Sequence, residues 1–310
     1  MRIAVLIPCY NEAATIAAVV GDFRRALPEA EIHVFDNNST DGSAELARAA
    51  GAAVTRVPVQ GKGEVVRAMF REVDADLYVM VDGDATYPAA RVRELLAPIQ
   101  ERSADMVVGT RLREYAAESF RPLHVLGNNL VLYAINALFR SRLTDVMSGY
   151  RAFSRRFVKT MPVLSHGFEI ETEMTLHSLE HRLPVVEVGI PYGERPEGSE
   201  SKLHTFRDGI RVLRTIFQLY KDYRPMAFFG IIGLAFVALA AATGLLVAIE
   251  FVETGRVAGI ARAILAVACG LVSVLSFATG AILDTLNRRA REIYVLLADQ
   301  VVEGRTSRRE

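Results

Sequence analysis

The sequence has 310 residues, 51% hydrophobic and 23% charged, so it is too apolar for a disordered chain and long enough for about two folded units. Its 36 basic and 36 acidic residues give a formal net charge of zero, which argues against a nucleic-acid-coating protein and an acidic solvating tail. The two cysteines, Cys9 and Cys269, stand far apart and predict neither a disulfide framework nor a metal-binding cysteine motif.

Short apolar runs alternate with segments of helical spacing over the N-terminal third of the chain. The apolar runs predict strands at 2–8, 31–35, 53–57, 76–81 and 105–109. Amphipathic spacing predicts helices at 12–26, 42–50, 63–73 and 88–102. This alternation predicts an α/β fold, in which a mostly parallel, doubly wound sheet has helices on both faces.

Polar motifs follow several of these strands, at the carboxyl ends where parallel sheets bind their ligands. Residues 7–12 (IPCYNE), 36–43 (DNNSTDGS) and 82–84 (DGD) come after the first, second and fourth strands. Residues 61–63 (GKG) precede the third helix. The four motifs therefore predict one binding site at one edge of the sheet.

In this order the motifs resemble those of the family 2 glycosyltransferases, which have the nucleotide-sugar-binding fold called GT-A. The sequence is most similar to the branch that charges a polyprenyl phosphate, typified by dolichol-phosphate mannose synthase. The resemblance covers nearly the whole chain. It implies a Rossmann-like GT-A domain, a nucleoside-diphosphate-sugar donor, a polyprenyl phosphate acceptor and a divalent metal.

The resemblance assigns the metal to the two aspartates of the DGD motif. A departing nucleoside diphosphate develops negative charge, which a hard cation such as Mg²⁺ or Mn²⁺ held by oxygen ligands can neutralise. Asp84 is then the main metal ligand, and Asp82 shares the ion or lies nearer the ribose. Relatives often have Gln two positions after the second Asp, where this chain has Thr86, so the role of Thr86 is open.

The nucleotide is expected at the ends of the first two strands. The family binds the base with a carboxylate at the position of Asp36, for which a capping or Asx-turn role is the alternative. Asn37 and Asn38 replace a common Asp-Gly, which leaves the base preference open, with UDP favoured over GDP. Cys9 is expected to be a packed small residue rather than a nucleophile. The other residues expected around the nucleotide are Pro8, Tyr10, Asn11, Glu12 and Lys62.

Basic and hydroxyl residues further along the chain match the positions that receive the acceptor phosphate in relatives. Guanidinium groups suit phosphate because they stay charged and present a planar fork. The alternative for each arginine alone is an ordinary surface position. A loop before residue 203 resembles the family loop that closes over the diphosphate and the acceptor. The candidates are Arg111, Arg121, Ser148, Arg151, Arg195, Ser201 and Lys202.

The segment 167–174 (GFEIETEM) places three glutamates at a spacing of two, which would share one face of a strand but scatter on a helix. The resemblance places it at the sugar and acceptor side. Because a phosphate acceptor is already anionic at neutral pH, no strong general base is required. We expect Glu171 or Glu173 to position sugar hydroxyls, the alternative being a partner for a nearby Arg or helix. His177 and His181, without a third ligand, are expected on a helix surface.

Two runs without charged residues, 226–249 and 263–283, each reach the roughly 20 residues that a helix needs to cross a bilayer. They predict a transmembrane hairpin, the alternative being buried core helices. Basic residues before the first run and after the second place both termini and the catalytic domain in the cytoplasm. Small residues in both runs favour close helix approach and a homo-oligomer.

Residues 201–224 set apolar side chains at three- and four-residue steps among lysines and arginines, which is typical of a helix lying on an anionic membrane. The predicted organisation is a catalytic domain over 1–200, this juxtamembrane helix over 201–224, the hairpin over 225–287 and a cytosolic tail over 288–310. The predicted partners are the sugar donor, the polyprenyl phosphate and the lipid bilayer, without nucleic acid.

The sequence thus predicts an inverting, metal-dependent transfer of a sugar from a nucleoside diphosphate to polyprenyl phosphate at the cytosolic membrane face. One alternative is a family 2 enzyme that is processive or uses another acceptor, although the chain has no Trp and so lacks the Gln-x-x-Arg-Trp motif of processive synthases. Another is a catalytically silent membrane adaptor that keeps the nucleotide fold.

Overall fold

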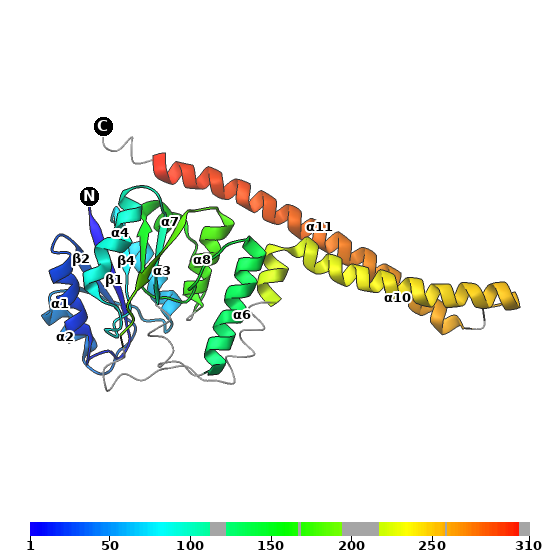
Figure 1. Cartoon of the computed structure of the whole chain (residues 1–310), viewed down its shortest axis with the longest axis horizontal. Helices are drawn as coiled ribbons and strands as arrows, with labels where there is room; N and C mark the ends of the chain where they lie inside the picture. Colours follow the sequence, from blue (N-terminus) through cyan, green and yellow to red (C-terminus); the bar gives the residue numbers. More distant parts are fainter. Residues whose placement is uncertain (112–121, 167–168, 194–216, 258, 304–310) are drawn as a thin grey trace. The chain divides into compact units, whose positions relative to one another are not determined.

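The computed structural model describes residues 1–111, 122–166, 169–193, 217–257 and 259–303. The chain forms two compact units, one of Met1–Gly209 with Leu297–Glu310 and the other of Ile210–Leu296. The sheet and its covering helices belong to the first unit, and the two long C-terminal helices supply most of the second (Figure 1).

The first unit is built on a sheet that has seven strands among the described residues, in the order β3-β2-β1-β4-β6-β5-β7. β1 pairs in parallel with β2 and β4, β2 with β3, and β5 with β7. β6 runs antiparallel between β4 and β5. The strands are β1 (Ile3–Cys9), β2 (Glu31–Asp36), β3 (Ala53–Arg56), β4 (Leu77–Met80), β5 (Met106–Arg111), β6 (Arg151–Ser154) and β7 (Val185–Ile190).

Both faces of this sheet are covered by helices, because the strands alternate buried apolar side chains between them. In β1, Ile3, Val5 and Ile7 pack toward one helical layer, and Ala4 and Leu6 pack toward the other. The first layer is α1 (Ile16–Ala26), α2 (Ser43–Ala49), the short 3₁₀ turn η1 (Ala89–Arg91) and α4 (Val92–Gln100). The second is α3 (Lys62–Glu72), α7 (Arg155–Thr160) and α8 (Ile170–Glu180). The predicted fold class, a mostly parallel sheet between helical layers, is confirmed.

The described part of the segment with three glutamates is helical. α8 begins at Ile170, with Glu169 as its N-cap residue, so the glutamates at 171 and 173 leave the helix in different directions. Another helix, α6 (Pro122–Phe139), packs beside α8. α8 therefore brings its first turn to the loop side of the sheet rather than adding a strand to it.

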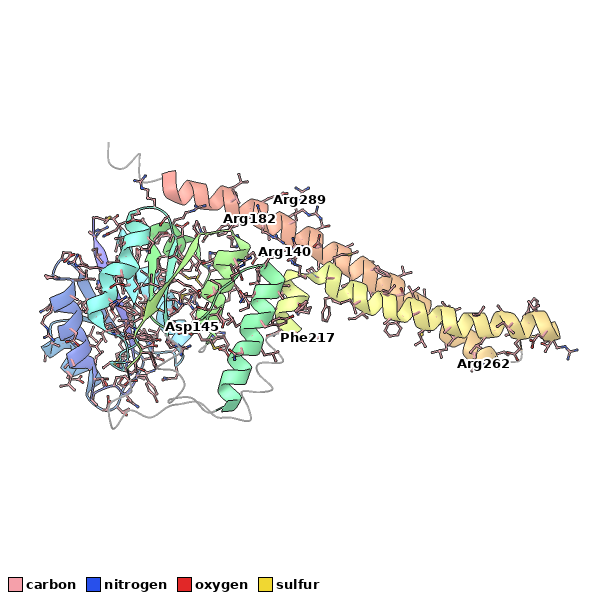
Figure 2. The ribbon with its side chains drawn as sticks, in the orientation of Figure 1. Arg140, Asp145, Arg182, Phe217, Arg262 and Arg289 are labelled. Atoms are coloured by element: carbon pink, nitrogen blue, oxygen red, sulfur yellow. The ribbon has the colours of Figure 1, made fainter. Side chains whose placement is uncertain are left out.

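The second unit contains the helix α10 (Pro225–Thr254) and the part of α11 (Ile260–Glu303) up to Leu296. The segments Pro225–Thr254 and Ile260–Leu296 are long and apolar enough to cross a membrane, and their large apolar side chains are mostly exposed, unlike those of core helices. Gly233 lies against the ring of Phe277, where an added Cβ would come within 2.9 Å. Arg262 lies at the turn between the helices (Figure 2). It pairs with Glu250 at 3.1 Å. The two helices thus pack as a hairpin.

Most of the predicted juxtamembrane helix falls outside the described residues, although 217–223 are helical. Arg121, Arg195, Ser201 and Lys202 also fall outside them. Their expected roles in phosphate binding stay predictions.

Candidate functional site

The carboxyl ends of β1, β2 and β4 lie side by side at one edge of the sheet. Each of these strands leads into a loop that contains a non-glycine residue in the left-handed region: Asn11 (φ 55°), Asn38 (φ 64°) and Ala85 (φ 58°). A left-handed alanine is uncommon and costs on the order of 1 kcal/mol. Strained loops at one edge are typical of functional sites, and all four sequence motifs gather here.

The centre of the site is an ion cluster of Lys62, Asp82 and Glu171. The Lys62 ammonium lies 2.6 Å from Asp82 Oδ1 and 2.6 Å from Glu171 Oε1. The Lys62 and Glu171 side chains are only 12% and 6% exposed, against 27% for Asp82. Burial alone would lower the pKa of Lys62, but the two carboxylates outweigh it and raise that pKa well above its usual range. Lys62 is therefore a permanent cation between two carboxylates.

Lys62 is positioned by the glycines on either side of it. An added Cβ would come within 2.1 Å of the His166 carbonyl oxygen at Gly61, which has φ +139°. At Gly63 it would come within 1.9 Å of the Ser165 carbonyl oxygen. The backbone of the GKG motif therefore packs directly against the backbone of the 165–166 loop. The Gly63 N–H donates a hydrogen bond to the His166 carbonyl oxygen at 3.2 Å. Only glycine fits this close approach.

Glu173 binds the backbone of the same loop. Its carboxylate accepts hydrogen bonds from the backbone N–H groups of Leu164 at 2.8 Å and Ser165 at 2.9 Å. The side chain is thus committed to the loop that packs on the GKG turn. Of the two glutamates expected to position sugar hydroxyls, Glu171 is the one in the ion cluster, and its role toward the sugar stays a prediction.

Asp84 is nearly buried, at 4% exposure, and is oriented by Thr86. Asp84 Oδ1 accepts hydrogen bonds from the Thr86 hydroxyl at 2.6 Å and from the Thr86 N–H at 3.2 Å. This Asx turn explains the left-handed Ala85 between them. The sequence left the role of Thr86 open, and in the structure Thr86 orients the Asp84 carboxylate.

Asp36 and its neighbours form the loop after β2. Asp36 Oδ1 accepts a 3.3 Å hydrogen bond from the Ser39 N–H, which fits the Asx-turn alternative, and the side chain is 5% exposed. Asn37 donates to the carbonyl oxygens of Val57 at 3.0 Å and Val59 at 2.7 Å, and accepts from the Gly61 N–H at 2.8 Å. Asn37 thus ties the end of β2 to the loop that leads into the GKG motif.

The loop after β1 is held by the loop after β2. The Asn11 N–H donates to the Ser39 hydroxyl at 2.9 Å, and the Thr40 N–H donates to Asn11 Oδ1 at 2.9 Å. The Glu12 N–H donates to the Ser43 hydroxyl at 2.8 Å. Two further nucleotide candidates are Pro8, in register with Phe35 across the strand pair, and Tyr10, 37% exposed.

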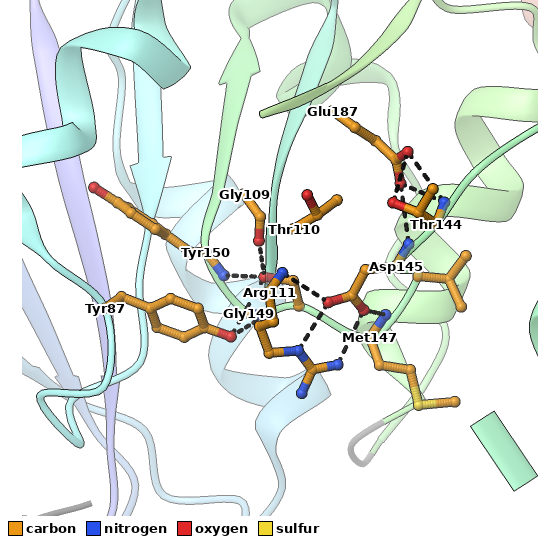
Figure 3. A network of polar contacts seen from close by, with 12 residues as sticks. Tyr87, Gly109, Thr110, Arg111, Thr144, Asp145, Met147, Gly149, Tyr150 and Glu187 are labelled. Carbon is orange, nitrogen blue, oxygen red and sulfur yellow. Dashed lines mark hydrogen bonds and ion pairs between the residues drawn. The ribbon is translucent and has the colours of Figure 1, made fainter. Parts of the chain in front are cut away.

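Arg111 and Asp145 form the main ion pair at the end of β5 (Figure 3). Burial alone would lower the pKa of Arg111 and raise that of Asp145, but their mutual contact outweighs burial and shifts both in the opposite directions. The guanidinium also lies over the Tyr192 ring, 5.7 Å from its centroid. Arg111 therefore lies near the edge of the site, where its guanidinium contacts Asp145 and Tyr192.

Two of the predicted acceptor-phosphate ligands are internal, which corrects the prediction. Ser148 has no exposed surface and donates to the Gly109 carbonyl oxygen at 2.6 Å. Arg151 is also fully buried, and donates to the carbonyl oxygens of Ser148 at 2.9 Å and Val146 at 2.8 Å and to the Thr175 hydroxyl at 3.0 Å. Neither side chain reaches a surface where a phosphate could bind. Both instead shape the loop before β6.

Two residues that the sequence analysis missed shape the same loop. An added Cβ at Gly149 would come within 2.2 Å of Asp82 Oδ2, so this glycine gives the Asp82 carboxylate its room. The Gly149 N–H donates to the buried Tyr87 hydroxyl at 3.3 Å (Figure 3). Gly149 lies between Ser148 and Arg151, which were read only as phosphate-binding side chains. Tyr87, three residues after Asp84, carried no such signal.

Cys9 and His177 are both buried side chains. Cys9 is buried, and burial raises the pKa of its thiol to about 11, so it is an unreactive packed residue as predicted. His177, predicted on a helix surface, is instead buried, and its ring packs edge-on against Phe157 with centroids 5.6 Å apart. The prediction for His177 was wrong because α8 is covered on this side by α7.

The donor set at the end of β4 fits a hard divalent cation. Asp82 and Asp84 supply carboxylate oxygens, the ligands that Mg²⁺ and Mn²⁺ prefer. In the described part of the chain no group of three or more His, Cys, Asp or Glu side chains could hold a metal. A cation at this site would therefore need further oxygens from a ligand such as a diphosphate.

Comparison with known proteins agrees with this geometry. The family model described as "Glycosyl transferase family 2" matches residues 4–161. The chain is 36% identical over 251 residues to glycosyltransferase AglJ of Haloferax volcanii, covering 81% of this chain and 82% of that protein. It is 29% identical over 229 residues to an undecaprenyl-phosphate mannosyltransferase of Micrococcus luteus, covering 66% of this chain and 88% of that protein.

The fold is also similar to a solved structure. The glucosyl-3-phosphoglycerate synthase of Mycobacterium tuberculosis, in complex with Mn²⁺, UDP and glucosyl-3-phosphoglycerate, superposes with a TM-score of 0.57 at 23% identity. The match covers 71% of this chain and 79% of that chain and supports the GT-A fold. Together with the family match over half of the sequence, these similarities show that the chain belongs to glycosyl transferase family 2 and is a glycosyltransferase.

Proposed function

We propose that this glycosyltransferase moves a hexosyl group from a nucleoside diphosphate sugar to polyprenyl phosphate, with inversion at the anomeric carbon. The observation that carries the proposal is the paired carboxylates of Asp82 and Asp84 at the end of β4, in a chain that continues into two helices apolar enough to cross a membrane. The similarity to an undecaprenyl-phosphate mannosyltransferase supports the acceptor class.

The donor binds beyond β1, β2 and β4. Asp36 accepts from an N–H of the base, the exposed Tyr10 stacks on the ring, and the loop residues Pro8, Asn11 and Glu12 surround the nucleotide. We favour UDP over GDP. Asp84 and Asp82 would hold Mg²⁺ or Mn²⁺, and the ion when bound neutralises charge on the departing diphosphate.

The transfer step needs no proton abstraction by the protein. A phosphate monoester carries about 1.5 to 2 negative charges at neutral pH, so its oxygen is already a nucleophile. That oxygen attacks the anomeric carbon, the bond from this carbon to the diphosphate oxygen breaks, and the electron pair leaves with the nucleoside diphosphate. Glu171, paired with Lys62, positions the sugar rather than taking up a proton.

The acceptor enters from the membrane side. Arg111 and the candidates outside the described residues, Arg121, Arg195, Ser201 and Lys202, bind its phosphate. The helices α10 and α11 form the transmembrane hairpin, with the catalytic domain and both termini in the cytoplasm, the amphipathic segment on the lipid surface, and self-association through the spans.

The test is a transfer assay in detergent with undecaprenyl phosphate, Mn²⁺ or Mg²⁺, and a panel of radiolabelled UDP- and GDP-sugars. We expect a labelled lipid with one UDP-sugar. We expect Asp84→Asn to abolish it and Asp22→Asn, a change at an exposed α1 carboxylate paired with Arg25, to leave it intact. A labelled product on a water-soluble acceptor, with none on the lipid, would overturn the acceptor assignment.

A further inference from the structure

The ammonium of Lys62 occupies one of the oxygens that a metal at Asp82 would need. Lys62 Nζ lies 2.6 Å from Asp82 Oδ1, which is the distance of a direct charge-assisted hydrogen bond. The other oxygen of this carboxylate faces Gly149. A divalent cation bound at Asp82 would therefore lie close to a buried positive charge that repels it.

Glu171 gives Lys62 a second partner. Its carboxylate is also 2.6 Å from the ammonium, and it lies on α8 rather than on the loop after β4. Lys62 can thus leave Asp82 and keep a charged partner by a small movement of its flexible side chain. Its backbone is fixed meanwhile, because Gly61 and Gly63 pack directly on the 165–166 loop.

We propose that Lys62 is a built-in counter-ion that takes the place of the divalent cation beside Asp82 until a nucleotide binds. This inference rests on the proposed function, since it assumes a metal at Asp82 and Asp84. Without a nucleotide, Lys62 neutralises Asp82 and weakens metal binding. When a diphosphate enters, its negative charge attracts the metal and offers Lys62 another partner, so the metal binds together with the donor rather than before it.

The experiment measures Mn²⁺ affinity by calorimetry on the full chain in detergent, without nucleotide. Lys62→Met leaves Asp82 and Glu171 uncompensated, and we expect it to bind Mn²⁺ at least about tenfold more tightly than the unaltered chain. Lys62→Arg keeps the cation and should stay within about twofold. Lys159→Met is the matched control. Lys159 donates to the carbonyl oxygens of Phe70 and Val73, at the opposite end of α3 from Lys62.

A second variant guards against misfolding of Lys62→Met. The double change Lys62→Met with Glu171→Met removes the cation and one carboxylate together, and it should still bind Mn²⁺ more tightly than the unaltered chain. Conversely, Glu171→Gln leaves Asp82 as the main partner of Lys62, and we expect about threefold weaker Mn²⁺ binding. Unchanged or weaker Mn²⁺ affinity in both folded Lys62→Met variants would overturn the inference.

A parallel titration with UDP separates this inference from the proposed function. If the unaltered chain binds Mn²⁺ with UDP but the Lys62 variants show no gain without it, the counter-ion role fails and the metal site stands. If no Mn²⁺ binds even with UDP, the metal dependence itself fails, and the counter-ion role fails with it. We expect the difference between Lys62→Met and the unaltered chain to shrink when UDP is present.

Discussion

Arg111 and Asp145 meet through two parallel hydrogen bonds, from Arg111 Nε to Asp145 Oδ2 at 2.8 Å and from Arg111 Nη2 to Asp145 Oδ1 at 3.0 Å. Their side chains are 15% and 12% exposed, so this two-point ion pair is largely shielded from water. The pair ties the end of β5 to the loop before β6. The same loop is held to β7 by Glu187, which accepts from the Thr144 and Asp145 N–H groups (Figure 3).

Replacing one partner of this ion pair should lower the free energy of unfolding more than replacing both partners does. Asp145→Leu leaves a nearly buried guanidinium without its carboxylate, and we expect a loss of about 3 kcal/mol in the free energy of unfolding. Adding Arg111→Met should recover part of that loss. Chemical denaturation of the single and double variants measures the coupling, and strictly additive losses would contradict a mutual ion pair.

Gly149→Ala should disturb the site without unfolding the chain. The added Cβ would come within 2.2 Å of Asp82 Oδ2, so the carboxylate has to move. A shift of this size in a metal-binding group predicts a fall of about a hundredfold in transfer rate. Gly21→Ala on α1, where the nearest atom would be 3.7 Å away, is the matched control. Equal rates for the two variants would show that Asp82 does not need this space.

Glu173→Ala should act on stability rather than on sugar binding. It removes two charge-assisted hydrogen bonds to the backbone of Leu164 and Ser165, and we expect a loss of about 2 kcal/mol in the free energy of unfolding. The KM for the sugar donor should change less than it does in Glu171→Gln. A KM effect confined to Glu173→Ala would reverse the roles given to the two glutamates.

His177 predicts a pH dependence of stability. Burial, followed by the neighbouring His181, lowers the pKa of His177 to about 3 from its ordinary value of 6.5. Below pH 6.5 the unfolded chain therefore takes up a proton that the folded chain excludes until about pH 3. Its contribution to stability is complete above pH 6.5 and falls by about 1.4 kcal/mol for each pH unit below it.

The measurement is the apparent melting temperature of the unaltered chain and of His177→Leu between about pH 7 and pH 5, across the upper part of that window. The unaltered chain should lose stability more steeply as the pH falls. Parallel slopes would contradict a buried, neutral His177.

The sequence predicted local structure better than it predicted side-chain environments. The strands and helices of the first hundred residues follow from the alternation of short apolar runs with segments of helical spacing. β6 was missed because only two of its four residues, Ala152 and Phe153, are apolar, and Arg151 was read as a phosphate ligand. The helical α8 could not be chosen over a strand, since three glutamates at a spacing of two fit either until the packing of Ile170 and Met174 is known.

At the site itself, contacts between residues far apart in the sequence limited what could be predicted. The pairing of Lys62 with Glu171 joins residues far apart in the sequence, and neither motif predicts the other. Arg151 looked like a phosphate ligand by residue type, yet it satisfies buried carbonyl groups inside the protein. Residue type predicted that charged side chains gather at this edge of the sheet, and packing decides which of them are buried and which are exposed.

The most direct test of the central claim is to identify both products of one reaction with undecaprenyl phosphate and the preferred sugar donor. Attack on the anomeric carbon predicts a hexosyl polyprenyl phosphate and an equal amount of nucleoside diphosphate. Release of nucleoside monophosphate with a lipid diphosphate would show transfer of a sugar phosphate instead. Nucleoside diphosphate and free sugar without any glycolipid would show hydrolysis, and either result would contradict hexosyl transfer to the lipid phosphate.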